Sequence, residues 1–236
     1  MVEKQVHMLI TIPALGCDER LYAKIAPELG DLVSLRTIMA DGDRLGACVE
    51  QVLAGAPERF IVLGTSFGGR VAIETALAAP ERVKGLVVIG ASAGATPDRA
   101  AGLRRSQRLR GGEFETVVGE MAAMIAYLPG PEGPAARDAF VAMAHTQGAE
   151  VAARQSDALA WREDIFPRLG EISCPALMLW GAWDQFVSPK EGLRLSMAVP
   201  HGRYAELPEC GHFPPLEAPD ETADAIRNWL ADTGLI

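Results

Sequence analysis

Short apolar runs rich in β-branched residues alternate along this chain with longer amphipathic stretches. This alternation predicts a mostly parallel sheet flanked by helices, because buried parallel strands read as continuous apolar runs and each crossover between them needs a helix. We therefore expect an α/β fold. The expected strands are His7–Ile12, 32–37, Phe60–Thr65, 85–90, Ala176–Gly181 and 203–207, and the expected helices are 19–29, 44–54, 67–79, 189–199 and 220–230.

Residues 97–170 interrupt this alternation. The stretch has no strand pattern, is rich in Ala, Arg, Met and Glu, and is punctuated by glycines and prolines, which predicts about four helices inserted between two strands. We expect residues 1–96 and 171–236 to form the α/β core domain. Residues 97–170 would form an all-helical cap over the carboxyl edge of the sheet, where ligands bind in such folds.

The sequence Gly64-Thr65-Ser66-Phe67-Gly68 stands between an expected strand and an expected helix. A Gly-x-Ser-x-Gly pattern in that context is typical of a nucleophile elbow. A serine on so sharp a turn has a strained backbone, and the chain passes too close to leave room for a Cβ at the two flanking glycines. An ordinary glycine-rich turn is the alternative, but the context favours Ser66 as a nucleophile.

A serine hydroxyl needs a base to take its proton. Among the four histidines, His212 follows the last expected strand, so it emerges at the same sheet edge as Ser66; a surface or capping role is the alternative. Asp184 follows the fifth expected strand and would orient the imidazole. Asp41 and Glu209 are the alternative carboxylates. The order Ser66, Asp184, His212 is the one that accompanies this type of elbow.

Together these motifs resemble the α/β-hydrolase fold family, and specifically its small capped serine esterases. The resemblance covers nearly the whole chain and rests on the elbow and on two further stretches, Trp180-Gly181-Ala182-Trp183-Asp184 and Gly211-His212-Phe213-Pro214-Pro215-Leu216-Glu217. It implies a Ser/His/Asp site beneath a helical lid and no cofactor. It also implies an oxyanion hole made by the backbone N–H groups of Leu15 and Phe67, with Pro13-Ala14 where the family usually has His-Gly.

The expected chemistry is hydrolysis of a carboxylic ester, thioester or lactone of a small, largely apolar substrate through an acyl-enzyme on Ser66. A C–C bond hydrolase or cofactor-free haloperoxidase with the same triad, and a receptor that binds without turnover, are the alternatives. The candidate substrate-binding residues, for each of which core packing is the alternative, are Trp183, Phe186, Val187, Phe213, Met124 and Met143.

Charge and cysteine content argue against several other functions. The net charge of −9 argues against nucleic-acid binding, which needs a basic surface. The four cysteines show no metal-binding spacing, and a reduced, cytoplasmic protein without a metal is the simplest interpretation. No stretch approaches the roughly 18–20 apolar residues of a membrane helix, so we expect no membrane partner. No cleavage site of a signal peptide follows the start, so we expect no signal peptide.

Five arginines gather at the start of the expected cap, with only Asp98 among them to oppose their charge. A solvated helix face is the simpler interpretation. The alternative is a docking surface for an acidic partner or substrate, such as an acyl carrier protein or a coenzyme A tail. The arginines are Arg99, Arg104, Arg105, Arg108 and Arg110.

Overall fold

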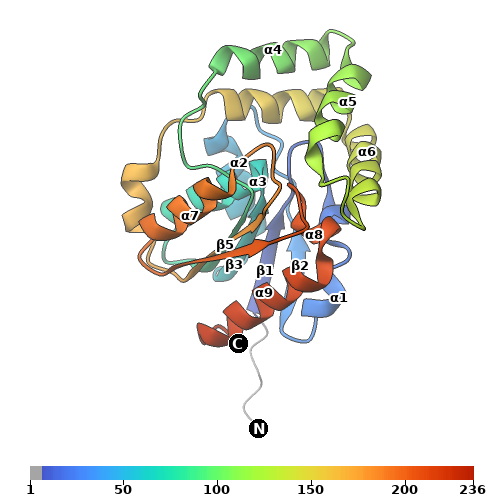
Figure 1. Cartoon of the computed structure of the whole chain (residues 1–236). Helices are drawn as coiled ribbons and strands as arrows, with labels where there is room; N and C mark the ends of the chain where they lie inside the picture. The colour runs from blue at the N-terminus through green and yellow to red at the C-terminus, as the bar shows by residue number, and fades with distance from the viewer. Residues whose placement is uncertain (1–6) are drawn as a thin grey trace.

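The computed structural model describes residues 7–236. This part of the chain contains a six-stranded sheet in the order β2-β1-β3-β4-β5-β6, in which every neighbouring pair is parallel (Figure 1). The predicted α/β fold is confirmed. The strands are β1 (His7–Ile12), β2 (Val33–Thr37), β3 (Phe60–Thr65), β4 (Val83–Ile89), β5 (Ala176–Gly181) and β6 (Gly202–Leu207).

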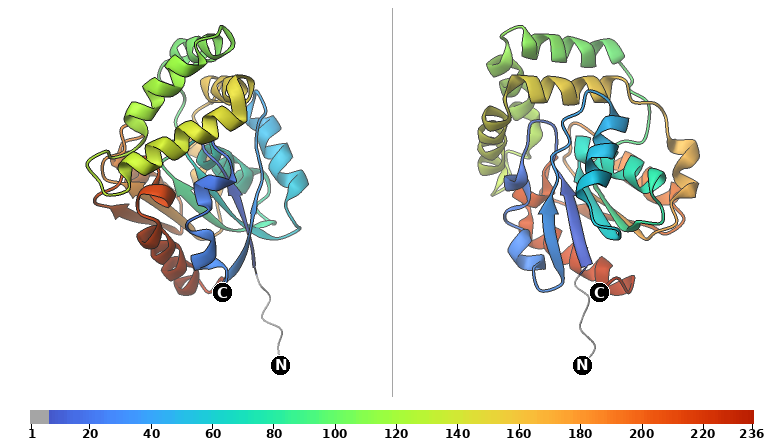
Figure 2. Two further views of the ribbon diagram at one scale, coloured as in Figure 1. Left: turned by 90° about the vertical axis from the view of Figure 1, so that its right-hand side faces the viewer. Right: turned by 180° about the vertical axis from the view of Figure 1, so that it is seen from behind.

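Helices cover both faces of the sheet (Figure 2). Successive strand side chains point to opposite faces, so Ile10 and Val62 pack in one hydrophobic cluster, whereas Leu9 and Leu63 pack in the other. The first cluster is closed by α2 (Leu45–Gly55), α3 (Phe67–Ala78) and α7 (Pro189–Ala198); the second is closed by α1 (Ala26–Leu29) and α9 (Pro219–Asp232).

A helical insertion separates β4 from β5 and lies over the carboxyl end of the sheet (Figure 1). It consists of α4 (Arg99–Arg110), α5 (Phe114–Ile125) and α6 (Gly133–Ala160). Gly148, with φ 79°, breaks the helical geometry of α6 and divides it into two helical segments. With α4 and α5, these segments agree with the prediction of about four helices from the glycines and prolines of this stretch. The division of the chain into a core domain and a cap domain stays a prediction.

The predicted single helix over residues 19–29 is wrong. The chain forms a short 3₁₀ helix, Glu19–Tyr22, and then the four-residue α1. Pro27 has no N–H to donate to the preceding turn, which prevents one continuous helix. The remaining short elements are the 3₁₀ helix Phe166–Glu171 and α8 (Pro214–Glu217). None of the helices found within residues 7–236 has the length and apolar character needed to span a membrane.

Candidate active site

Ser66 occupies the sharp turn between β3 and α3. Its φ of 56° makes it the only non-glycine residue with a positive φ in the described part of the chain. Its N–H donates to the carbonyl of Ile89 at 2.7 Å, which ties the turn to the neighbouring strand β4. A non-glycine residue in such a conformation costs about 1–3 kcal/mol, which the surrounding structure must offset. The turn presents the hydroxyl at the N-terminus of α3, where free N–H groups favour negative charge.

The two glycines that flank the turn are required by close backbone contacts. A Cβ on Gly64 would lie 2.0 Å from the carbonyl oxygen of Gly68, and a Cβ on Gly68 would lie 2.0 Å from that of Ile12. No side chain fits at such distances, so α3 can begin directly against β3 and β1 only with glycine at both positions. This agrees with the expectation from the Gly-x-Ser-x-Gly pattern.

His212 and Asp184 form a buried pair at the same edge of the sheet. Nδ1 of the imidazole lies 2.7 Å from Oδ2 of the carboxylate, and their side chains are 2% and 1% exposed. The other oxygen, Oδ1, accepts the backbone N–H groups of Phe186 and Val187 at 2.8 and 2.9 Å. Because a carboxylate only accepts, Nδ1 carries the imidazole proton and Nε2 is left as an acceptor. This is the tautomer that a general base requires.

The loop that carries His212 is held by a second buried carboxylate. Glu217 accepts the backbone N–H groups of Gly211 and Phe213, each at 2.8 Å, and that of Tyr127 at 2.7 Å. Burial raises the pKa of Glu217, and these N–H donors counteract the shift only in part. The N–H of His212 itself donates to the carbonyl of Ile125 at the end of α5. His212 is thus fixed both by its own loop and by the helical insertion.

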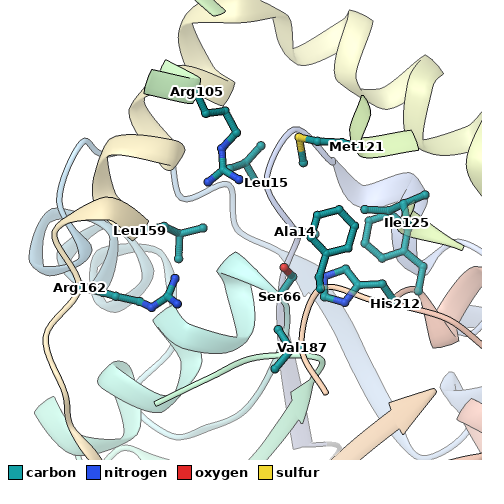
Figure 3. Close-up of a pocket in the computed structure, with 12 residues that line it drawn as sticks. Ala14, Leu15, Ser66, Arg105, Met121, Ile125, Leu159, Arg162, Val187 and His212 are labelled. Atoms are coloured by element: carbon teal, nitrogen blue, oxygen red, sulfur yellow. The ribbon is translucent and has the colours of Figure 1, made fainter. Parts of the chain in front are cut away.

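Ser66 and His212 line the same cavity, of about 200 Å³, between the sheet edge and the insertion. Figure 3 shows the serine hydroxyl and the imidazole pointing into it. The cavity is smaller than the ~300–1,000 Å³ typical of sites for drug-sized ligands, so it suits a compact substrate. Its other lining residues are Ala14, Leu15, Arg105, Met121, Ile125, Leu159, Arg162, Phe186, Val187 and Phe213.

The structure brings some of the predicted substrate-binding residues to this cavity and leaves others away from it. Phe186, Val187 and Phe213 line it. Trp183 is 54% exposed and stacks on Tyr127. The remaining two are methionines of the insertion.

Of these methionines, Met143 is fully buried in the same hydrophobic cluster as Phe140 and Phe213, whereas Met124 lines a neighbouring surface cavity that shares Phe186. Both belong to the stretch that was expected to form the helical cap. Whether each methionine lies in the core or at a cavity depends on how α5 and α6 pack. The spacing of residues in the sequence does not determine that packing.

Of the two predicted oxyanion donors, Leu15 follows β1 in the chain, and Phe67 directly follows Ser66. Leu15 lines the cavity, and Phe67 is the first residue of α3, with its side chain buried in the core. The loop that contains Leu15 is held by Gln155, whose Oε1 accepts the N–H of Gly16 at 2.8 Å and whose Nε2 donates to the carbonyl of Ala40 at 2.8 Å. Sequence reasoning missed Gln155, because 139 positions separate it from Gly16.

Nothing in the sequence indicated that Gly90 contributes to the site. This glycine follows β4 with φ 58°, and a Cβ there would lie 3.0 Å from Nδ1 and Cε1 of His212 and 3.1 Å from Oδ2 of Asp184. The glycine therefore leaves the room that the His–Asp pair occupies. The alternative carboxylate Asp41 points elsewhere and pairs with Arg154 at 2.8 Å.

The arginine cluster at the start of the insertion is largely neutralised. Arg104 pairs with Asp98 at 3.5 Å, and Arg99 lies over the ring of Trp161. Two further arginines form ion pairs with acidic side chains of α5, of α6 and of the turn between α4 and α5: Arg108 with Glu113 and Glu120, and Arg110 with Glu150 and Asp157. Little free positive charge remains for docking an acidic partner. Arg105 differs from the others because it turns into the cavity that Ser66 and His212 line.

The four cysteines are free thiols. Burial raises the pKa of Cys17 and of Cys210 far above the ordinary value for a thiol, and it raises those of Cys48 and Cys174 to about 11. Thiols with such pKa values are protonated near neutral pH and are poor nucleophiles. They therefore do not compete with Ser66 for the role of nucleophile.

Residues 12–225 match the model of the alpha/beta hydrolase family, and the chain belongs to this family. The resemblance inferred from its motifs is confirmed. Among solved structures, an esterase from Thermogutta terrifontis superposes with a TM-score of 0.87 at 22% identity, covering 96% of this chain and 90% of that one. The enol-lactonase from Burkholderia xenovorans gives the same TM-score at 17% identity, covering 98% and 94%. These likenesses establish the fold.

Curated relatives are hydrolases of more than one kind. A pimeloyl-[acyl-carrier protein] methyl ester esterase from Edwardsiella ictaluri is 26% identical over 92% of this chain and 91% of its own length. A 2-hydroxy-6-oxononadienedioate/2-hydroxy-6-oxononatrienedioate hydrolase from Dechloromonas aromatica is 29% identical over 72% of this chain. The chain spans 61% of the length of that second relative. The protein is thus an α/β hydrolase with esterase-like relatives.

Proposed function

We propose that the protein is a serine hydrolase that cleaves a carboxylic ester of a compact substrate through an acyl-enzyme on Ser66. The observation that supports this most strongly is the shared cavity, which a serine on a strained turn and the buried His212–Asp184 pair both reach. Binding alone needs neither the strained turn nor the buried pair, so the arrangement favours catalysis over a receptor function.

In the proposed mechanism, Oγ of Ser66 attacks the ester carbonyl while Nε2 of His212 accepts its proton. The tetrahedral oxyanion receives hydrogen bonds from the backbone N–H groups of Leu15 and Phe67, a contribution worth about 10²–10³ in rate per donor in other enzymes. His212 then gives its proton to the leaving alcohol. Water attacks the acyl-enzyme, His212 accepts a proton from it, and the carboxylic acid departs as Ser66 regains its hydrogen.

We also propose that residues 97–170 act as a cap domain on the core of residues 1–96 and 171–236. The insertion supplies one wall of the cavity, including Met121, Ile125 and Leu159, and the sheet edge supplies the catalytic residues. Closing the site from above excludes water and strengthens electrostatic interactions around the reacting carbonyl. A site of this kind uses no cofactor or metal, because the nucleophile, base and oxyanion donors are all protein groups.

Hydrolysis of a C–C bond is the second candidate, favoured by the relative from Dechloromonas aromatica. A compound named as a 2-hydroxy-6-oxo dienedioate contains no ester, so its hydrolysis requires cleavage beside a ketone. The same triad serves both reactions, and the sequence similarity to this relative is comparable to that of the esterase. The broader coverage of the esterase, 92% of this chain, and the compact cavity make the ester the preferred substrate class.

The test compares wild-type protein with Ser66→Ala on p-nitrophenyl esters of increasing acyl length and on 2-hydroxy-6-oxo-6-phenylhexa-2,4-dienoate. We expect turnover of short acyl esters that falls by about 10⁴–10⁶ in the variant, and little cleavage of the dienoate. Faster cleavage of the dienoate would favour the second candidate. Equal ester hydrolysis by both proteins would refute Ser66 as the nucleophile.

A further inference from the structure

Two arginines line the cavity that contains Ser66. Arg105 comes from α4 and Arg162 follows the end of α6, so both belong to the helical insertion or its junction with the core. Figure 3 shows their guanidinium groups directed toward the cavity from the side opposite His212. The remaining lining is largely apolar, which makes two cations there unusual.

Neither arginine has a carboxylate partner within 4.0 Å among residues 7–236, although Arg104, Arg108 and Arg110 on the same helix do. Nε of Arg105 donates to Oγ of Ser156 at 2.8 Å, and Nε of Arg162 donates to the carbonyl of Gly94 at 3.2 Å. These contacts use one donor of each guanidinium and fix its direction. The terminal nitrogens therefore remain available to a ligand in the cavity.

The charged groups near the two arginines, Arg70 and Glu191, are engaged with other partners. Burial lowers the pKa of Arg105, and burial together with the charges of Arg70 and Arg105 lowers that of Arg162. The carboxylate of Glu191 opposes the second shift, but it accepts a hydrogen bond from Ser92 and lies 3.6 Å from Arg194. Arg70 has its own partner, Glu74, at 2.7 Å.

Both side chains are half-buried, and partly removing a cation from water without a charged partner is unfavourable. Arginine stays charged in proteins, so these two side chains cannot escape the cost by losing a proton. An anionic group bound in the cavity would supply the missing partner. The chain as a whole carries a net charge of −9 and repels anions, so a local positive site would also be needed to attract one.

We propose that the substrate carries a free carboxylate and that Arg105 and Arg162 bind it while Ser66 attacks the ester carbonyl. Guanidinium groups match the planar, two-oxygen geometry of a carboxylate. The cavity of about 200 Å³ restricts such a substrate to a compact molecule, of which a monoester of a short dicarboxylic acid is the simplest form. This inference rests on the proposed function, because it identifies the class of ester.

The test uses two nearly isosteric substrates that differ in charge: monomethyl glutarate and its neutral amide analogue, methyl glutaramate. For the wild-type protein we expect kcat/KM to be about 10–100-fold higher for the carboxylate, the range that charge-assisted hydrogen bonds provide. In Arg105→Gln and in Arg162→Gln this ratio falls toward one, whereas Arg105→Lys keeps part of it. Arg104→Gln, on the same helix and 62% exposed on its side chain, is the matched control and keeps the wild-type ratio.

A binding measurement separates this inference from the hydrolytic mechanism. Calorimetry on Ser66→Ala, which cannot turn over either compound, should show tighter binding of monomethyl glutarate than of methyl glutaramate, and replacing Arg105 in that background should remove the difference. Equal binding and equal kcat/KM for the two compounds would overturn the inference, even if neutral esters are hydrolysed. Preferential binding without hydrolysis by the wild-type protein would support the carboxylate site and refute the ester mechanism.

Discussion

Replacing Gly90 with alanine should damage the catalytic pair more than the fold. The new Cβ would lie 3.0 Å from Nδ1 and Cε1 of His212 and 3.1 Å from Oδ2 of Asp184, against about 3.5–4.0 Å for an ordinary carbon contact. The imidazole would have to move by roughly 0.5–1 Å, and a displacement of about 1 Å at a catalytic group costs on the order of 10² in rate. An alanine at φ 58° would also cost about 1–2 kcal/mol of stability.

Gly234→Ala is the control for the backbone cost. Gly234 has φ 68°, and a Cβ there would meet no atom within 4 Å. Both variants should lose about 1–2 kcal/mol in urea unfolding, but only Gly90→Ala should lose about 10² in kcat on a short p-nitrophenyl ester. A Gly90→Ala protein whose kcat matches that of Gly234→Ala would refute the inference that this glycine makes room for the base.

Three further predictions concern the residues that position the proposed base and the proposed oxyanion loop. Asp184→Asn should lower kcat by about 10⁴ with little change in KM, because the amide favours the wrong imidazole tautomer; steady-state kinetics check this. Gln155→Ala should lower kcat by about tenfold or more by releasing the loop of Leu15, and an equal loss of kcat in the exposed control Arg104→Gln would contradict that reason. Glu217→Gln should lose about 1–3 kcal/mol in urea unfolding at pH 7, because an amide NH₂ would face backbone donors. Since burial raises the pKa of Glu217, the folded protein binds that proton more tightly than the unfolded chain. The free energy of unfolding of the wild type, relative to that of Glu217→Gln, should therefore increase as pH falls from neutral toward the usual glutamate pKa. A decrease would contradict a raised pKa of Glu217 in the folded protein.

Much of the fold and the candidate triad could be predicted because their signals are local in the sequence. The inner strands β3 and β5 are continuous buried runs, and the elbow at Ser66 needs two glycines within five residues. Asp184 and His212 each lie in the loop that follows a strand, so parallel topology brings them to the edge where Ser66 emerges. The helix expected over residues 19–29 was wrong because it was extended across Pro27, whose ring and missing N–H interrupt a helix.

The surroundings of the site depend on tertiary packing and were not predictable in this way. Arg105 has neighbours of the same type in the sequence, and only the packing of α4 against α6 directs it inward while Arg104 and Arg108 face acidic partners. Gln155 acts on a loop at the opposite end of the chain. Gly90 looks like an ordinary strand end until the His–Asp pair is seen beside it.

The most direct test of the central claim is reaction with a fluorophosphonate followed by mass spectrometry of the intact protein and its peptides. If His212 and Asp184 activate Ser66, the serine oxygen displaces fluoride, and one phosphonyl group should be found on the peptide that contains Ser66. Ser66→Ala should remain unlabelled, and His212→Ala should react far more slowly. A phosphonyl group on another residue, or labelling of Ser66→Ala at the wild-type rate, would contradict the account.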